Sequence, residues 1–309
     1  MQKTDKIYDL VIVGGGPAGV SAAIYAKRAG MDVIVLANKI GGMVNDAYLI
    51  GNYAGMGEIS GADLARKFGE QLESLKIETR AVVVDGINRQ GDFFEIKTED
   101  REIFRGRAVI LATGMRRKKL GVPGEEEFLH RGVGYCALCD GPLFKNKNVA
   151  VIGGGNAGIS AAIYLAGIAE KIYVIEALKN LPGEDFWQGQ LAREKKVTVL
   201  LDSMPVEILG GKRVTGIKLR GSEEILAVDG VFVEIGGQPE TGLAKQLGLK
   251  MDAKGYIEVG VDGATSVPGV WAAGDNTTGS GGVRQIITAA AEGAVAGGAV
   301  AKFLRIKNK

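Results

Sequence analysis

One segment of this sequence occurs twice. Residues 14–37 read GGGPAGVSAAIYAKRAGMDVIVLA, and residues 153–176 read GGGNAGISAAIYLAGIAEKIYVIE. Aligned without a gap at an offset of 139 residues, 11 of the 24 positions are identical. Because self-similarity at a fixed offset indicates a repeated structural unit, we interpret the segments as copies of one ancestral strand–helix–strand unit.

Each copy predicts the same local structure. An apolar strand (7–13 or 149–152) leads into a G-x-G-x-x-G turn, which an Ala-rich helix and a second strand (32–36 or 171–175) follow. The first glycine permits the tight bend, the second lets backbone approach a pyrophosphate, and the third lets the helix pack on the strand. Two such turns predict two dinucleotide sites, although turns that bind nothing stay an open alternative. The glycines are Gly14, Gly16 and Gly19 in the first copy and Gly153, Gly155 and Gly158 in the second.

The segments after each copy continue in parallel and predict an α/β fold with two Rossmann-like domains. A helix (62–75) and then strands (82–84, 93–98 and 108–111) follow the first copy. A helix (186–195) and then strands (206–209, 214–219, 225–228 and 230–235) follow the second. This order predicts a parallel sheet with a small β-meander, twice. The remainder, from about 245 to 309, has no counterpart and contains a predicted strand at 270–273 and a helix from 283.

Composition excludes several classes of protein. Hydrophobic residues make up 46% and charged residues 24% of the 309 residues, which is typical of a globular protein and excludes disorder. The net charge of +2 implies no global field for nucleic acid or membrane. Two Cys and one His are too few for a disulfide scaffold or a closed zinc site, so we expect no metal. No leader is predicted, and the uncharged stretch 149–169 is interpreted as strand, turn and buried helix, so cytoplasmic is the default expectation.

A Cys-x-x-Cys motif, Cys136-Ala137-Leu138-Cys139, lies just before the second copy. Such a pair can be a redox dithiol, half of a zinc site, or two inert cysteines. The cysteine count disfavours zinc, and a Cys-x-x-Cys beside βαβ units favours redox chemistry. This spacing can lower a thiol pKa and close a reversible disulfide.

With these motifs, the sequence resembles low-molecular-weight thioredoxin reductases over nearly its whole length. The resemblance implies a fold of the FAD/NAD(P)-linked disulfide reductase type, with an FAD domain at 1–116 and 245–309 and a second domain at 117–244 that carries the Cys-x-x-Cys. It also implies a domain rotation, for which 115–120 and 237–245 are hinge candidates, and a homodimer. The matching motifs are GGGPAG (14–19), Gly41-Gly42, NYAG (52–55), ATG (112–114), CALCD (136–140), GGGNAG (153–158), AGD (273–275) and Arg284-Gln285.

The resemblance also implies roles for individual residues. Cys139 would be the thiol beside the flavin, in a charge-transfer contact or transient adduct, and Cys136 the thiolate that attacks the disulfide of a thioredoxin-like partner. Asp140 would be the general acid, unless it is a solvated loop acid or a helix cap. The Asp275 carboxylate would bind ribityl hydroxyls. The FAD residues are Gly14, Gly16, Pro17, Ala18, Gly19, Ala37, Asn38, Gly42, Met43, Asn52, Val83, Thr113, Gly114, Gly274, Asp275, Arg284, Gln285 and Ile286.

The second nucleotide site departs from NADPH-dependent members of the family. The basic cluster expected after its second strand is replaced by Ile175-Glu176-Ala177-Leu178-Lys179, and the acid expected at 159–162 is missing. An acid at Glu176 accepts from a ribose 2′-hydroxyl and repels a 2′-phosphate. The sequence therefore predicts NADH, or a donor such as reduced ferredoxin or a deazaflavin, over NADPH. The nicotinamide-nucleotide residues would be Gly153, Gly155, Asn156, Gly158 and Glu176.

Other functions remain open alternatives. The chain could be an FAD-dependent dithiol oxidase that uses oxygen, or a flavin redox sensor without turnover; a hydroperoxide-reductase flavoprotein is disfavoured because no thioredoxin-like region precedes residue 7.

The basic run Arg116-Arg117-Lys118-Lys119 could dock an acidic ferredoxin or thioredoxin, or be a solvated linker. His130 is expected to be structural, and the Ala/Gly-rich helix at 283–304 a close-packing element or a subunit interface.

Overall fold

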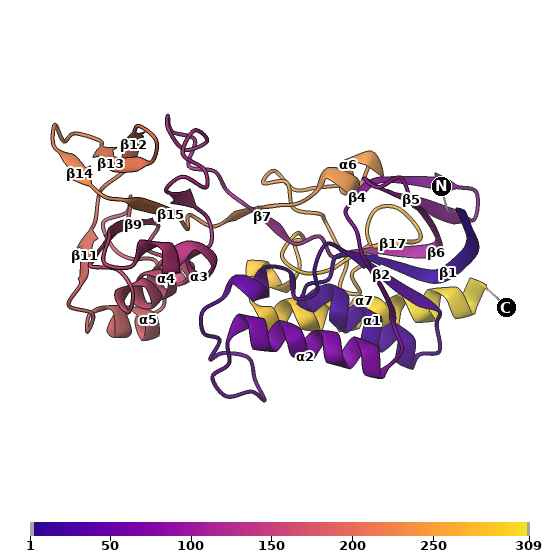
Figure 1. The fold of residues 1–309 in the computed structure, drawn as a ribbon. Coiled ribbons are helices and arrows are strands. Elements are labelled where there is room, and N and C mark those ends of the chain that lie inside the picture. The colour runs from indigo at the N-terminus through magenta and orange to yellow at the C-terminus, as the bar shows by residue number, and fades with distance from the viewer. Residues whose placement is uncertain (1–2, 308–309) are drawn as a thin grey trace. The chain divides into compact units, whose positions relative to one another are not determined.

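The computed structural model describes residues 3–307, which form two compact units (Figure 1). Unit 1 comprises Met1–Asn45, Ile50–Arg116 and Gln238–Lys309, and unit 2 comprises Asp46–Leu49 and Arg117–Gly237. Each is an α/β unit built on a parallel sheet that includes one copy of the repeated segment, so the predicted fold class is confirmed.

The sheet of unit 1 has the strand order β3-β2-β1-β6-β5-β4, with β17 also paired to β6. β1, β2, β3, β6 and β17 are parallel, whereas β5 pairs antiparallel with the first half of β6 and with β4. The meander is therefore continuous with the parallel sheet through the long strand β6. The bounds are β1 Lys3–Val13, β2 Val33–Ala37, β3 Glu78–Ala81, β4 Val84–Gln90, β5 Phe93–Thr98, β6 Ile103–Leu111 and β17 Val270–Ala272.

Helices α1, α2 and α7 gather on one side of this sheet (Figure 1). α1 and α7 make the closest contact, because a Cβ at Gly293 would lie 2.0 Å from the Ala18 carbonyl oxygen and one at Gly297 would lie 2.6 Å from that of Ala22. This is helix-to-helix packing without intervening side chains. The bounds are α1 Pro17–Arg28, η1 Gly42–Asp46, α2 Gly61–Ser74, α6 Gly242–Gln246, η3 Ser280–Gly282 and α7 Ile286–Lys307.

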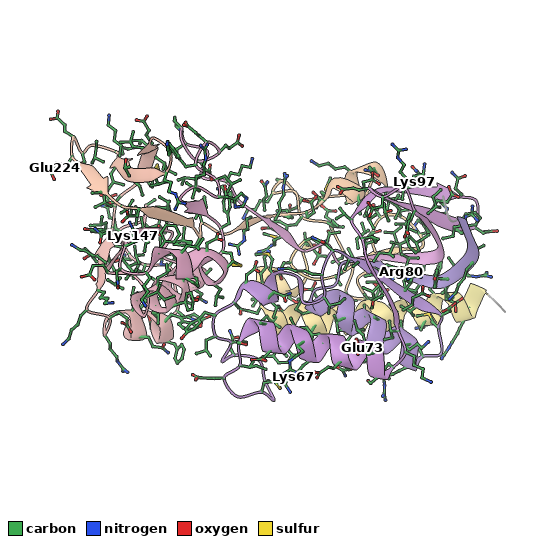
Figure 2. The ribbon with its side chains drawn as sticks, in the orientation of Figure 1. Lys67, Glu73, Arg80, Lys97, Lys147 and Glu224 are labelled. Atoms are coloured by element: carbon green, nitrogen blue, oxygen red, sulfur yellow. A yellow bond between two sulfur atoms is a disulfide. The ribbon has the colours of Figure 1, made fainter. Side chains whose placement is uncertain are left out.

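The predicted Ala/Gly-rich helix is thus α7, and two of its glycines, Gly293 and Gly297, serve close packing. Over Ile286–Ile306 it is also long and apolar enough to meet a length-and-composition criterion for a membrane span. It packs closely against α1, and 33% of this span is buried. Most charged side chains instead lie on exposed faces, as the six labelled residues in Figure 2 illustrate.

Unit 2 has a five-stranded parallel sheet in the order β11-β10-β9-β15-β8 and a separate antiparallel sheet β12-β13-β14. α3, α4 and α5 lie on one side of the parallel sheet, and β12–β14 lie on the other (Figure 1). The bounds are β8 Val133–Gly134, α3 Ala137–Asp140, η2 Gly141–Phe144, β9 Asn148–Ile152, α4 Asn156–Ala166, β10 Lys171–Ile175, α5 Asp185–Leu191, β11 Val197–Leu200, β12 Pro205–Gly210, β13 Val214–Leu219, β14 Ile225–Ala227 and β15 Gly230–Val233.

Two apolar layers form the core of unit 2. Val149 and Val151 on β9 pack with Ile159 and Leu165 of α4 on the helical side. Ala150 and Ile152, whose side chains point to the opposite face of β9, pack against β12–β14. A strand that is buried on both faces explains why 149–152 is a continuous apolar run.

The chain path differs from the sequence-based expectation in several places. The predicted strand at 82–84 is wrong, because Val82 and Val83 connect β3 to β4, which have different partner strands. Short strands β7 (Met115–Arg117) and β16 (Gly237–Pro239), which the sequence pattern did not predict, pair with each other. They lie in the two segments that we had named as hinge candidates.

Candidate active site: a redox disulfide and two dinucleotide turns

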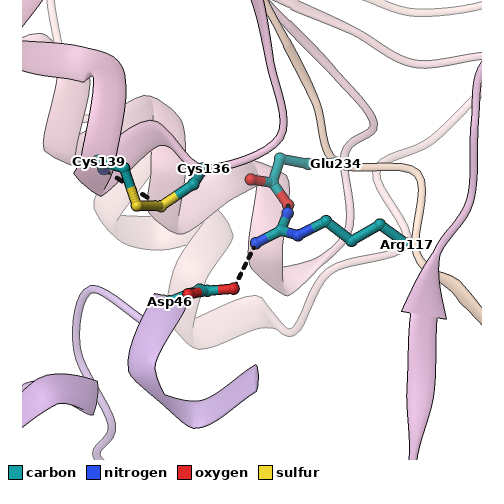
Figure 3. The surroundings of a disulfide bond; sticks show 5 residues. All are labelled: Asp46, Arg117, Cys136, Cys139 and Glu234. Atoms are coloured by element: carbon teal, nitrogen blue, oxygen red, sulfur yellow. Dashed lines mark hydrogen bonds and ion pairs between the residues drawn. A yellow bond between two sulfur atoms is a disulfide. The ribbon is translucent and has the colours of Figure 1, made fainter. Parts of the chain in front are cut away.

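The two cysteines form a disulfide in unit 2 (Figure 3). Strand β8 pairs with β15 and ends just before Tyr135, so the motif follows the carboxyl end of an edge strand of the parallel sheet. Cys136 and Cys139 are bonded with their Cα atoms 5.3 Å apart. Cys136 is the N-cap of α3, and its sulfur accepts a hydrogen bond from the Cys139 N–H at 3.2 Å. The local turn therefore fixes both sulfurs, and Cys139 is the more exposed of the two.

Asp140 lies in the same turn. Its backbone N–H donates to the Cys136 carbonyl at 3.1 Å, and a Cβ at Gly134 would lie 2.8 Å from its Oδ2. Its carboxylate is partly exposed and lies against the Gly134 backbone at the end of β8. It is therefore neither a fully solvated loop acid nor a cap of α3.

An arginine with two acidic partners also lies in unit 2 (Figure 3). The Arg117 guanidinium contacts Glu234 Oε2 at 3.2 Å and Asp46 Oδ2 at 2.9 Å. Burial raises the pKa of the Glu234 carboxyl, and the Arg117 guanidinium opposes this by favouring the ionised form. Arg117 therefore neutralises a buried acid.

The glycine turn of unit 1 leaves open space at the start of α1. Gly14 has φ +117°, and a Cβ there would lie 2.0 Å from the Ala112 carbonyl oxygen. A Cβ at Gly16, in contrast, would meet no described atom within 4 Å, and no side chain among the described residues caps α1. Open space therefore borders the start of α1, where uncapped N–H groups would suit a pyrophosphate.

A glutamate of α7 holds the Gly274–Asp275 turn by hydrogen bonds. Glu292 Oε2 accepts hydrogen bonds from the Gly274 N–H at 2.8 Å and the Thr277 hydroxyl at 3.0 Å. Burial raises the pKa of the Asp275 carboxyl, against the opposing effect of the Arg284 guanidinium. Arg284 stacks over the Tyr256 ring at 3.9 Å. A half-buried carboxylate beside an arginine suits the hydroxyl-rich chain of FAD.

Further expected FAD residues meet within unit 1. The Asn276 amide, which is completely buried, donates to Thr113 Oγ1 at 3.0 Å, and the Asn52 amide donates to Gln285 Oε1 at 3.1 Å. Gly42 lies against Gly16, since a Cβ at Gly42 would be 3.3 Å from the Gly16 Cα. The remaining ones lie along unit 1: Pro17, Ala18 and Gly19 in α1, Ala37 ending β2, Asn38 and Met43 exposed after it, Val83 between β3 and β4, Gly114 after β6, and Ile286 starting α7.

The glycine turn of unit 2 borders a cavity of about 810 Å³, a size that suits a small-molecule site. A Cβ at Gly155 would meet no described atom within 4 Å, and α4 likewise has no side-chain cap among the described residues. The carboxylate of Glu184 accepts from the Asn156 amide at 2.9 Å. The lining residues come from five stretches and one single residue: 118–123, 152–157, 175–178 with 182, 203–206 and 234–236, together with Arg220.

Glu176 lies at the end of β10 in the wall of this cavity. Its Oε2 accepts from the Gly154 N–H at 2.7 Å and its Oε1 from the Leu178 N–H at 2.9 Å. Each oxygen keeps lone-pair capacity for a further donor such as a ribose hydroxyl. Glu176 thus shapes the glycine turn as well as lining the cavity.

Most of the basic run 116–119 is paired with acids of the chain. Arg116 lies 3.8 Å from Glu240, and Lys119 lies 2.6 Å from Glu126. Lys118 has no ion-pair partner among the described residues and lines the cavity of unit 2. The run is therefore no open basic patch. His130, which has φ +60°, is exposed in a turn.

Sequence reasoning missed several residues that organise these sites. They are Arg117 with Glu234, Glu292, and the pair Glu125 and Tyr135. An acid near a motif could have signalled them, but Arg117 lies 117 residues from Glu234, and the bond between Glu125 and Tyr135, 10 residues apart, follows no regular spacing of a helix or strand. Among residues 3–307, no group of three or more His, Cys, Asp or Glu side chains is arranged to hold a metal.

Comparison with known proteins gives a consistent result. The family model "Pyridine nucleotide-disulphide oxidoreductase" matches residues 8–293. A thioredoxin reductase of Listeria monocytogenes is 38% identical over 98% of this chain and 96% of its own length. An NADH dehydrogenase of Ferdinandcohnia aciditolerans is 40% identical over 94% of this chain, which spans 56% of that protein.

Solved structures of thioredoxin reductases are also similar to this chain. The crystal structure of T. acidophilum thioredoxin reductase is 36% identical, covers 97% of this chain and 100% of its own, and superposes with a TM-score of 0.91. A ferredoxin-flavin thioredoxin reductase of Clostridium acetobutylicum is 35% identical over 97% and 98% of the chains, with a TM-score of 0.53. The chain therefore belongs to the pyridine nucleotide-disulphide oxidoreductase family and is a flavoprotein disulfide oxidoreductase like the thioredoxin reductases.

Proposed function

We propose that this protein uses FAD to reduce its Cys136–Cys139 disulfide with electrons from NADH and then reduces the disulfide of a thioredoxin-like protein. The proposal rests on one observation: unit 2 holds both the redox disulfide and a cavity beside a dinucleotide-type glycine turn, and Glu176 lies at that turn. The expected FAD residues gather around the equivalent turn of unit 1.

FAD, when bound, accepts an electron pair from the donor and passes it to the disulfide. The N–H groups at the start of α1 would bind its pyrophosphate. Asp275, half-buried beside Arg284, would bind its hydroxyls, and Glu292 holds the backbone of Gly274 in place. These residues bind and orient the cofactor.

The thiol chemistry balances on this chain's own atoms. Two electrons and two protons convert the disulfide into the Cys136 and Cys139 thiols. The Cys136 thiol passes its proton to Asp140, and the resulting thiolate attacks one sulfur of the partner's disulfide, breaking that bond and releasing a thiolate, which takes this proton from Asp140. The Cys139 thiol then loses its proton to Asp140 in the same way, and its thiolate attacks the Cys136 sulfur. This attack re-forms the Cys136–Cys139 disulfide and releases the partner's second sulfur as a thiolate, which takes the second proton from Asp140.

Three observations favour NADH over NADPH. Glu176 places a carboxylate where the 2′-phosphate of NADPH would lie. Ala177 and Leu178, which follow it in the cavity wall, bring no cation; the cations of the lining, Lys118, Lys119 and Arg220, come from other segments. The relative from Ferdinandcohnia aciditolerans is named an NADH dehydrogenase. The cavity itself is open above the glycine turn, which is what a working nucleotide site needs.

Reduced ferredoxin is the second candidate donor, because a ferredoxin-flavin thioredoxin reductase is a structural neighbour. The pairing of Arg116, Arg117 and Lys119 with acids weakens the basic surface that an acidic ferredoxin would need. NADH is therefore the donor that we propose.

Anaerobic mixing tests the proposal. Oxidised enzyme is mixed with NADH, NADPH or reduced ferredoxin while flavin absorbance is followed, and thioredoxin is then added. We expect NADH to bleach the flavin fastest and thioredoxin to restore it. Faster bleaching by NADPH or by ferredoxin would refute the donor assignment. Oxygen consumption with a dithiol, and failure to reduce thioredoxin, would instead identify a dithiol oxidase.

A further inference from the structure

Glu125 is a buried carboxylate with three hydrogen-bond donors. Its side chain is 2% exposed, and its Oε2 accepts from the Gly121 N–H at 2.6 Å. Its Oε1 accepts from the Leu120 N–H at 2.7 Å and from the Tyr135 hydroxyl at 2.6 Å. A buried carboxylate without such donors would strongly destabilise the folded state. The carboxylate therefore holds the Leu120 and Gly121 backbone and the Tyr135 hydroxyl close to it.

The three donors come from two parts of unit 2 with separate tasks. Leu120 and Gly121 line the dinucleotide cavity. Tyr135 stands between β8 and Cys136, the N-cap of α3. One carboxylate therefore fastens the wall of the cavity and the residue that precedes the redox motif.

The tyrosine is well suited to this task. Burial, followed by the hydrogen bond to Glu125 and its negative charge, raises the pKa of Tyr135 above its ordinary value. The hydroxyl therefore keeps its proton and donates it. Because β8 is only two residues long, its pairing with β15 anchors the motif weakly, and the Tyr135 side chain adds a second anchor next to Cys136.

We propose that Glu125 and Tyr135 are positioning residues for Cys136, which they hold in register with the wall of the dinucleotide cavity. The inference rests on the proposed function only in taking that cavity to hold a nucleotide. Holding Cys136 favours the disulfide, because a fixed turn keeps the two sulfurs within bonding reach, as in any pre-organised reaction. Without the anchor, the disulfide should be reduced more readily.

The deciding variant is Tyr135→Phe, which removes one hydroxyl and keeps the ring. Tyr173→Phe on β10 is the matched control, since the Tyr173 hydroxyl makes no hydrogen bond to any described residue. Both FAD-loaded enzymes are equilibrated anaerobically with reduced and oxidised dithiothreitol, and the free thiols are alkylated and counted by mass spectrometry. Flavin content and thermal unfolding establish that each variant is folded.

We expect Tyr135→Phe to change the exchange equilibrium constant two- to tenfold towards the dithiol, the range that loss of one hydrogen bond implies. Tyr173→Phe should leave it unchanged. A Tyr135→Phe constant equal to that of the wild type would overturn the inference, because a purely structural role lowers thermal stability without moving this equilibrium.

Glu125→Gln extends the test to the cavity. A glutamine oxygen cannot accept all three donors, so the dissociation constant of ADP-ribose should rise together with the change in exchange constant. If the wild type binds no ADP-ribose, the NADH proposal fails, while the Tyr135→Phe result still decides the positioning role. If Glu125→Gln does not fold, Tyr135→Phe remains decisive.

Discussion

The carboxylate of Glu176 accepts a hydrogen bond from the backbone N–H of Gly154 at 2.7 Å, which joins the end of β10 to the glycine turn of unit 2. A second bond, from the Leu178 N–H at 2.9 Å, fixes the other oxygen. The residue that would select NADH therefore also shapes the turn that would bind its pyrophosphate.

Replacing Glu176 tests both roles. Glu176→Gln replaces one of the two accepting oxygens with an NH2 group. That NH2 group would face a backbone N–H, so the glutamine keeps only one acceptor for the two N–H donors. We expect a loss of about 1–3 kcal/mol of stability and a roughly tenfold rise in the KM for NADH with a smaller change for NADPH. Steady-state kinetics and thermal unfolding measure these effects. Glu223→Gln, an exposed acid of the same unit, is the control; equal effects in both variants would contradict the assignment.

Serine variants separate the two electron-transfer stages. Cys139→Ser and Cys136→Ser remove one sulfur each without disturbing unit 1, where the expected FAD residues lie. Both variants should retain FAD and still be bleached by NADH, yet lose thioredoxin reduction, because serine cannot form the disulfide. Flavin absorbance and a coupled thioredoxin assay test this. Unimpaired thioredoxin reduction in either variant would refute the redox role of the pair.

The ion pairs of Arg117 predict a pH-dependent stability. The Glu234 carboxyl is largely buried, and its pKa in the folded state is raised above the ordinary value of 4.5. The folded state thus binds more protons than the unfolded state as pH rises above that value, so this group lowers stability as pH increases. Arg117→Met removes the opposing cation and should enlarge the effect.

We therefore expect Arg117→Met to lose about 1–3 kcal/mol, with a larger loss at pH 8 than at pH 5. Urea unfolding at both values measures it. Arg116→Met is the matched control, since Arg116 is exposed and 3.8 Å from Glu240, and surface pairs contribute little. A loss that is independent of pH would contradict the role of Glu234.

The contact between α7 and α1 predicts opposite effects for two neighbouring glycines. A Cβ at Gly293 would lie 2.0 Å from the backbone oxygen of Ala18, whereas one at Gly298 would meet no described atom within 4 Å. Gly293→Ala should cost about 1–3 kcal/mol and lower FAD content, because Ala18 belongs to the glycine turn. Gly298→Ala should gain up to about 1 kcal/mol, since alanine favours helix. Thermal unfolding and flavin absorbance measure both, and equal effects would refute the packing argument.

Much of the fold could be predicted because its signals are local. A glycine turn between an apolar strand and an Ala-rich helix has few backbone alternatives, and β13 was predicted at its observed bounds, Val214–Leu219. The strand predicted at 82–84 was wrong because β-branched residues alone do not say which strand becomes the partner. Short strands such as β8 have too few residues to show the alternation of apolar and polar side chains that predicts a strand.

The sequence by itself determined the duplication, the two glycine turns and the Cys-x-x-Cys pair, since each depends on residues close together in the chain. Only the tertiary structure decided how Arg117 is paired with Glu234, how Glu125 meets Tyr135, and how Glu292 holds Gly274. The three links have a common physical reason. A charged or polar side chain becomes buried only where another segment supplies its hydrogen-bond partner, and that partner is brought near by the folding of the sheet and not by its position in the sequence.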